Sequence, residues 1–81
     1  MHISIENFPP GITVEEVREF LGPSDEIENI QLTDAGNAEN VVAMVTVSSS
    51  QTGANAMAEF IDGRFFKDRR LTAIALALLK E

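Results

Sequence analysis

Three stretches of the chain have the composition and spacing of β-strands. Residues 3–6 alternate apolar with polar side chains, which is the period of a half-buried strand. In residues 27–32, isoleucine and leucine surround asparagine and glutamine, and this stretch predicts a second strand. Residues 40–47 are mostly β-branched and predict a strand that is buried on at least one face. We expect this third stretch to be the central strand of a small sheet.

A helical period predicts two helices. The first lies between Thr13 and Gly22, because Thr13 and Glu16 have the spacing of a capping box and glycine followed by proline is a typical stop. Its apolar stripe contains Val14, Val17, Phe20 and Leu21. Its outward side carries Glu15, Glu16 and Glu19. The second helix spans residues 51–62 and ends before Gly63. Its inward residues are predicted to be Ala54, Met57, Ala58 and Ile61.

The last apolar stretch, residues 71–79, fits two structures. Alanine and leucine favour a helix by propensity, but large residues alternate with alanines, and the strand period fits better. The predicted order is then strand, helix, strand, strand, helix, strand, which is the ferredoxin-like βαββαβ arrangement. We therefore predict an α+β fold in which two helices cover one face of a four-stranded antiparallel sheet and leave the other face open.

Size and composition limit the chain to one domain. Its 81 residues can bury one modest core, so we predict a single domain over residues 1–81. The absence of cysteine excludes disulfides and thiolate metal sites and fits a reducing compartment. The longest apolar run is too short to span a bilayer, and no charged-then-apolar leader precedes the first strand. We expect a soluble, cytoplasmic protein without a membrane partner.

The charge is distributed unevenly along the chain. Residues 1–40 contain nine acidic residues and one basic residue, a net charge of −8. Residues 41–81 contain five basic and four acidic residues, a net charge of +1. The overall charge of −7 works against tight, nonspecific binding to phosphate polymers. A local basic site is still compatible with it, because the potential at a surface depends on where the charges lie.

No residue pattern indicates catalysis. His2 is the only histidine, and the only titratable residue near it is Glu6, whereas a metal-binding or catalytic histidine needs partners that orient it. The glutamates of the first helix are interpreted as a solvated face. No glycine-rich phosphate loop or nucleophile motif is present. We predict that the protein is not an enzyme and uses neither a metal nor a cofactor.

Nearly the whole chain resembles an RNA recognition motif. Residues 3–8, Ile-Ser-Ile-Glu-Asn-Phe, look like the family's first-strand hexamer, and residues 40–47 occupy the position of its third-strand octamer. The capped first helix, with Phe20 before its terminal glycine, and Ile27 fall where the family has equivalent residues. Asp62 and Gly63, followed by the Arg-Arg-Leu of residues 69–71, resemble the segment before the family's fourth strand. The resemblance implies a ferredoxin-like fold and single-stranded RNA as a partner.

The chain departs from the family at the positions that stack on bases. The family octamer begins with a basic residue and glycine and has aromatic residues at its third and fifth places. Those four places hold Asn40, Val41, Val42 and Met44, and the aromatic place of the hexamer holds Ser4. Stacking on an aromatic side chain is worth about 1–3 kcal/mol per base. RNA binding by this chain is therefore expected to be weak or atypical.

If the family register holds, the open face of the sheet carries Ser4, Asn29, Gln31, Val42, Met44 and Thr46. This face is interpreted either as a binding surface or as a surface that solvent or a C-terminal segment covers. The register of the last strand decides its character. Family spacing turns Leu71 and Ala73 inward and leaves residues 74, 76 and 78 outside, whereas burial alone favours the reverse. We favour the family register near Leu71, which would make the face apolar and suited to a protein partner or self-association.

Residues 64–70 form the only basic cluster, with Phe65 and Phe66 interleaved. In one interpretation the basic side chains hold phosphates while an exposed phenylalanine stacks on a base. In the other, one phenylalanine enters the core and the charges are solvated. The family resemblance makes this segment a loop or a short hairpin.

Two functions follow from these patterns. In the first, an RRM-type protein binds single-stranded RNA weakly through the sheet face and the basic loop. Its nucleic-acid-binding residues would be Ser4, Asn29, Gln31, Val42, Met44, Lys67, Arg69 and Arg70. In the alternative, a module of the same fold does not bind RNA and uses its aliphatic face or its acidic first helix to bind protein, including a second copy as a homodimer. A ferredoxin-like small-ligand or regulatory domain is a third and weaker hypothesis.

Overall fold

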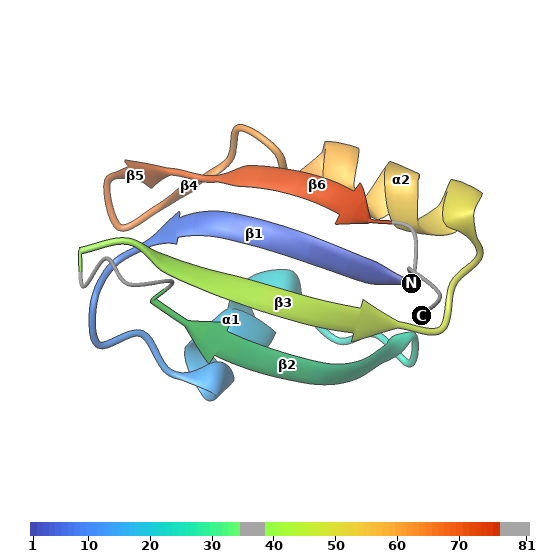
Figure 1. Ribbon diagram of the computed structural model, residues 1–81, viewed down its shortest axis with the longest axis horizontal. Coiled ribbons are helices and arrows are strands. Elements are labelled where there is room, and N and C mark those ends of the chain that lie inside the picture. Colours follow the sequence, from blue (N-terminus) through green and yellow to red (C-terminus); the bar gives the residue numbers. More distant parts are fainter. Residues whose placement is uncertain (35–38, 77–81) are drawn as a thin grey trace.

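A computed structural model describes residues 1–34 and 39–76 of the chain. Four strands form one antiparallel sheet in the order β2-β3-β1-β6. Their bounds are His2–Phe8 for β1, Ile27–Thr33 for β2, Val41–Val47 for β3 and Thr72–Leu76 for β6. The helices α1, Val14–Leu21, and α2, Gln51–Ile61, lie on the same side of this sheet (Figure 1). The predicted ferredoxin-like α+β fold is confirmed.

A two-stranded hairpin leads into β6. It consists of β4, Phe65–Phe66, and β5, Arg69–Arg70. Its turn residues Lys67 and Asp68 both have positive φ angles, 50° and 70°, as a tight hairpin turn requires.

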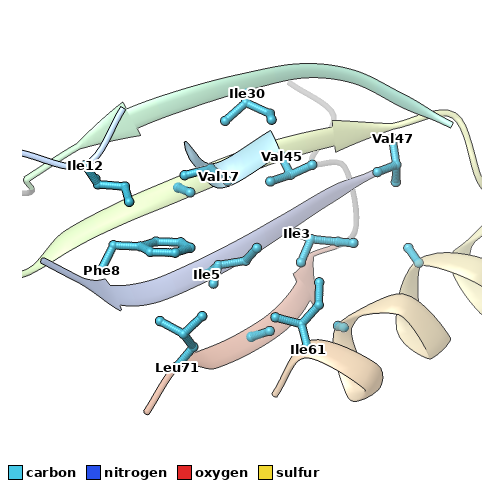
Figure 2. Close-up of a cluster of buried hydrophobic side chains, with 14 residues drawn as sticks. Ile3, Ile5, Phe8, Ile12, Val17, Ile30, Val45, Val47, Ile61 and Leu71 are labelled. Carbon is cyan, nitrogen blue, oxygen red and sulfur yellow. The ribbon is translucent and has the colours of Figure 1, made fainter. Parts of the chain in front are cut away.

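The core lies between the sheet and the helices (Figure 2). Every second residue of the central strands is buried in it, because neighbouring side chains of a strand point to opposite faces. The strands contribute Ile3, Ile5, Phe8, Ile30, Ala43, Val45, Val47 and Ala73. The helices contribute Val17, Ala54, Ala58 and Ile61. The inward residues predicted for α2 are confirmed, with Met57 partly buried against the core.

The predicted capping box is present at the start of α1. The Thr13 hydroxyl accepts a hydrogen bond from the Glu16 backbone N–H at 3.1 Å, and the Glu16 carboxylate accepts one from the Thr13 backbone N–H at 3.0 Å. The predicted apolar stripe is wrong at one residue, because the side chain of Val14 does not pack against the core and remains 36% exposed. The packed part of α1 begins at Val17, so the first turn of this short helix extends beyond the core.

The C-terminal stretch forms a strand, and its register is the one that the family spacing predicts. Ala73 is opposite Ile5 of β1, which faces the core, and Ile74 is opposite Ser4 on the other face. Leu71 and Ala73 are buried, whereas Ile74 and Leu76 are 52% and 39% exposed. The helix α2 contacts β6 and faces the core with alanines, so a small inward side chain fits there. Residues 77–79 of the predicted strand lie outside the described residues.

A β-bulge at Asn7 reverses the alternation of β1. Ile5 is opposite Ala43 and Phe8 is opposite Val41, so two residues of β1 face the single residue between them in β3. Asn7 has a φ of 85°, in the left-handed region that asparagine tolerates better than most residues. Its amide donates to the Arg70 carbonyl at 3.0 Å and accepts from the Arg69 guanidinium at 3.3 Å. Because of this extra residue, Phe8 points into the core and not onto the open face.

Replacing Asn7 separates the two contributions of the bulge. Asn7→Ala removes both hydrogen bonds and places an ordinary side chain at positive φ, so the free energy of unfolding is expected to fall by about 1–3 kcal/mol. Asn7→Gly loses the same hydrogen bonds but tolerates the backbone angle, so it should be the more stable variant. Urea unfolding measures both. An alanine variant that unfolds at the wild-type urea concentration would contradict the role of this bulge.

The charge of Glu16 gives the stability a pH dependence. The pKa of its carboxyl is lowered, first by the hydrogen bond from the Thr13 backbone N–H and then by the hydrogen bond from Lys67. A lowered pKa stabilises the fold above the pKa of the unfolded chain, and this contribution is lost as the pH falls through the folded-state pKa. Glu16→Gln should therefore lower the Tm at neutral pH, and the difference from wild type should shrink as the pH falls below the pKa of an unfolded glutamate and through the lowered folded-state pKa. Glu15→Gln is the control, since it removes a charge from the same turn without touching either contact. A constant difference across the pH range would contradict this assignment.

Candidate nucleic-acid interface on the open sheet face

The strand register brings the predicted face residues together. One row across the sheet contains Gln31, Met44, Ser4 and Ile74, in the order β2, β3, β1, β6. The next row contains Asn29, Thr46, His2 and Leu76. Val42 belongs to a third row, opposite Thr33 of β2. Five of the eight predicted binding residues, Ser4, Asn29, Gln31, Val42 and Met44, thus share the face that the helices leave open.

The two halves of this face differ in chemistry. On the β2 side, the amides of Asn29 and Gln31 are exposed and can donate to and accept from base edges. On the β6 side, Ile74 and Leu76 are exposed and apolar. Ser4, between Met44 and Ile74, is only 9% exposed. Its hydroxyl is therefore a poor contact for a ligand.

The face also contains a histidine that the sequence analysis did not include among the binding residues. His2 is opposite Thr46, and its ring nitrogen Nδ1 lies 3.1 Å from the Thr46 hydroxyl oxygen. The two-residue period of β1 could have identified it, because His2 and Ser4 are separated by one inward residue. Within residues 1–34 and 39–76, His2 provides the only ring among the rows described above.

The Arg69 guanidinium holds together three parts of the chain at one end of the sheet. Its Nη1 donates to the Glu39 carbonyl at 2.7 Å, to the Asn7 side-chain oxygen at 3.3 Å and to the Phe8 carbonyl at 3.5 Å. These acceptors belong to β1 and to the segment before β3. Arg69 is accordingly half-buried, and much of its hydrogen bonding serves the fold.

The other two predicted basic residues lie elsewhere. Lys67 pairs with Glu16 of α1 at 3.2 Å, on the side of the sheet that the helices cover. Arg70 is exposed, and its guanidinium lies beside Gly63, just after α2. The three basic side chains of the hairpin, Lys67, Arg69 and Arg70, therefore lie in three different places, and Lys67 is not at the rim of the open face.

The two phenylalanines of the hairpin have different environments. Phe66 packs edge-to-face against Phe8 and Phe20, with ring centroids 5.4 Å and 5.6 Å away. Phe65 is 65% exposed. One phenylalanine thus joins the core, as the second interpretation of this segment predicts, and the other remains accessible.

The described residues contain neither a cluster of metal-ligating side chains nor a membrane-spanning helix. Over residues 1–34 and 39–76, histidine, aspartate and glutamate side chains do not gather in groups of three or more that could hold an ion. In the same part of the chain, neither helix has the length and hydrophobicity needed to cross a bilayer.

Comparison with known proteins gives a relative by sequence and several structures of the same fold. The chain is 27% identical over 70 residues to the U4/U6 snRNA-associated-splicing factor PRP24 of Ophiostoma ulmi, and these residues are 86% of this chain but only 8% of that protein. Among solved structures, Pes4 RRM3 has a TM-score of 0.79 and 20% identity, covering 99% of this chain and 95% of that one. Mip6 RRM3 has a TM-score of 0.76 and 18% identity, covering 91% and 89%.

The family assignment has support from both sequence and structure. The family model for the RNA recognition motif matches residues 3–72, which contain both helices, the complete strands β2 and β3, and all of β1 except His2. The two solved structures share the fold over 99% and 91% of this chain. The chain therefore belongs to the RNA recognition motif family.

Proposed function

We propose that this RRM-type domain binds single-stranded RNA weakly through its open sheet face. The observation that carries this proposal is the pair of exposed amides on β2, Asn29 and Gln31, beside the apolar side chains of Met44 and Val42 on β3. These residues lie on the surface where the fold commonly binds unstacked bases. Asn29 and Gln31 would hydrogen-bond to base edges, and Met44 and Val42 would provide apolar contact. The 27% identical relative is named as a U4/U6 snRNA-associated splicing factor, which supports RNA as the ligand.

The composition of the face explains why the binding would be weak. Valine, methionine and serine replace the rings on which bases stack, and each lost stack removes about 1–3 kcal/mol. The formal charge of −7 adds a general repulsion of phosphates. Arg69, at one end of the sheet, is the basic side chain that we assign to a phosphate contact, whereas Lys67 is directed toward α1 and Arg70 lies beside Gly63 after α2.

A ring introduced at Met44 should strengthen RNA binding. Met44→Phe places an aromatic side chain between Gln31 and Ser4, and one added stack should raise the affinity about tenfold. Met44→Leu is the control, because it keeps an apolar side chain without a ring. The measurement is an amide-shift titration with a pool of short single-stranded RNAs at low salt. Wild-type shifts at Ser4, Val42 and Met44 are expected, and no shift at millimolar RNA would exclude the proposal.

The β6 half of the face favours a second function, self-association. Ile74 is 52% exposed beside Ser4, and Leu76 is 39% exposed beside His2. Exposed apolar side chains that are next to each other on a sheet face often mark a contact with protein. A homodimer in which two open faces pack together would bury these residues.

Sedimentation over a concentration series tests this second function. The wild-type chain is expected to show a rising average mass with concentration, and Ile74→Ser should abolish the rise because it removes the most exposed apolar side chain of the patch. Thr72→Ser, a conservative change at another exposed position of β6, is the matched control. A strictly monomeric wild-type profile would exclude the homodimer.

A further inference from the structure

A hollow on the opposite side of the molecule is not used by either proposed function. It lies between α1 and the β4–β5 hairpin, on the side of the sheet that the helices cover, and has a volume of about 250 Å³. It is lined by two carboxylates, two aromatic rings and one ammonium group. These belong to Glu16, Glu19, Phe20, Phe66 and Lys67.

The aromatic part of the hollow is fixed by the core. The rings of Phe20 and Phe66 meet edge-to-face at 5.6 Å and 87°, and both also pack against Phe8. Phe8 is completely buried, so it holds the two rings in place from below. A ligand would therefore meet a preformed surface and would not need to order it.

Cations of the chain itself already bind to this surface. The Lys67 ammonium lies 5.3 Å from the centre of the Phe66 ring and 3.2 Å from the Glu16 carboxylate. The Arg64 guanidinium lies 5.2 Å from the centre of the Phe20 ring and 4.8 Å from that of Phe60. Both cations are attracted to ring faces, and Lys67 is also attracted to a carboxylate.

One carboxylate of the hollow remains available. Glu19 forms no side-chain ion pair within residues 1–34 and 39–76, whereas Glu16 pairs with Lys67. The helix that carries Glu19 is also acidic, because α1 contains three glutamates and one arginine. This potential repels the phosphates of RNA and attracts cations.

We propose that this hollow binds an arginine side chain from a basic peptide segment of a partner protein. The guanidinium would lie over the ring of Phe66, pair with Glu19 and compete with Lys67 for that ring and for Glu16. Arginine fits better than lysine, because its planar group stacks on rings and forms two parallel hydrogen bonds with a carboxylate. The proposal gives the acidic first helix a defined ligand, and it does not depend on RNA binding at the open face.

The test is an amide-shift titration of the full chain with a capped heptapeptide, Gly-Ser-Arg-Ser-Arg-Ser-Gly. The control peptide has citrulline in place of both arginines and so keeps the shape of the side chain without its charge. The arginine peptide is expected to shift the amides of Glu19, Phe20, Phe66 and Lys67, whereas the citrulline peptide should not. No shift at millimolar peptide, or equal shifts with citrulline, would overturn the proposal.

Two pairs of variants separate a defined site from general attraction to an acidic surface. Glu19→Gln should weaken peptide binding about threefold to fivefold, and Glu15→Gln, on the same helix but outside the hollow, by less than about twofold. Lys67→Gln should strengthen binding about twofold by removing the internal competitor, more than Arg18→Gln does. All four side chains are exposed or half-buried at the surface, and the unperturbed amide spectrum checks that each variant is folded.

The remaining outcomes also decide the question. Equal effects of Glu15→Gln and Glu19→Gln would overturn the proposal in favour of diffuse attraction. Amide shifts at Ser4, Val42 and Met44 on addition of the peptide would overturn the proposal, because the peptide would then bind to the open face. Amide shifts at Glu19 and Phe66 on addition of RNA would also overturn it, because the hollow would then be a nucleic-acid site. The failure of RNA binding at the open face would leave this proposal unaffected, because the two sites are monitored by different amides.

Discussion

The structure depends on the pairing of β1 with its two neighbours and on the bulge that ends this pairing. β1 lies between β3 and β6, and its residues Ile3 and Ile5 have no exposed surface. At Asn7 the alternation changes phase, so Phe8 also turns inward. Without this change, the largest side chain of β1 would lie on the open face, and the rings of Phe20 and Phe66 would lack the partner against which they pack.

The same bulge connects the sheet to the hairpin. Asn7 receives a hydrogen bond from Arg69 and donates one to the Arg70 carbonyl, while Arg69 also reaches the Glu39 carbonyl before β3. The basic segment is therefore not a loose loop over the sheet. Its position is set by backbone geometry in β1, and this position directs Lys67 toward α1. A single strand irregularity thus influences both the open face and the hollow beside α1.

The fold is independent of the contacts that its family commonly makes with bases. The core is built from inward residues such as Ile5, Val45 and Val17, whereas the positions that usually carry stacking rings point outward. Changing an outward residue of the sheet leaves core packing almost unaffected, because the side chain on that face contacts neighbours across the strands and solvent. The framework of an RNA recognition motif can therefore persist with valine, methionine and serine at those positions, and the face can acquire a different chemistry.

The sequence by itself determined the elements and the residues of the open face. The capping box of Thr13 and Glu16 acts between near neighbours, so the helix start could be derived from spacing. The two-residue period of the strands, placed in the family register, likewise identified Asn29, Gln31, Val42 and Met44 as outward residues. The sequence left the register of the last strand open, because in an alternation of large residues with alanines either set can face the core. The tertiary structure decides this register, because Ile74 lies opposite Ser4 and the alanines of α2 face the core. The pairs Asn7 with Arg69 and Glu16 with Lys67 join residues 62 and 51 positions apart. Only the tertiary structure decided these contacts, because they depend on where a hairpin turn directs three cations, and no local pattern along the chain specifies that direction.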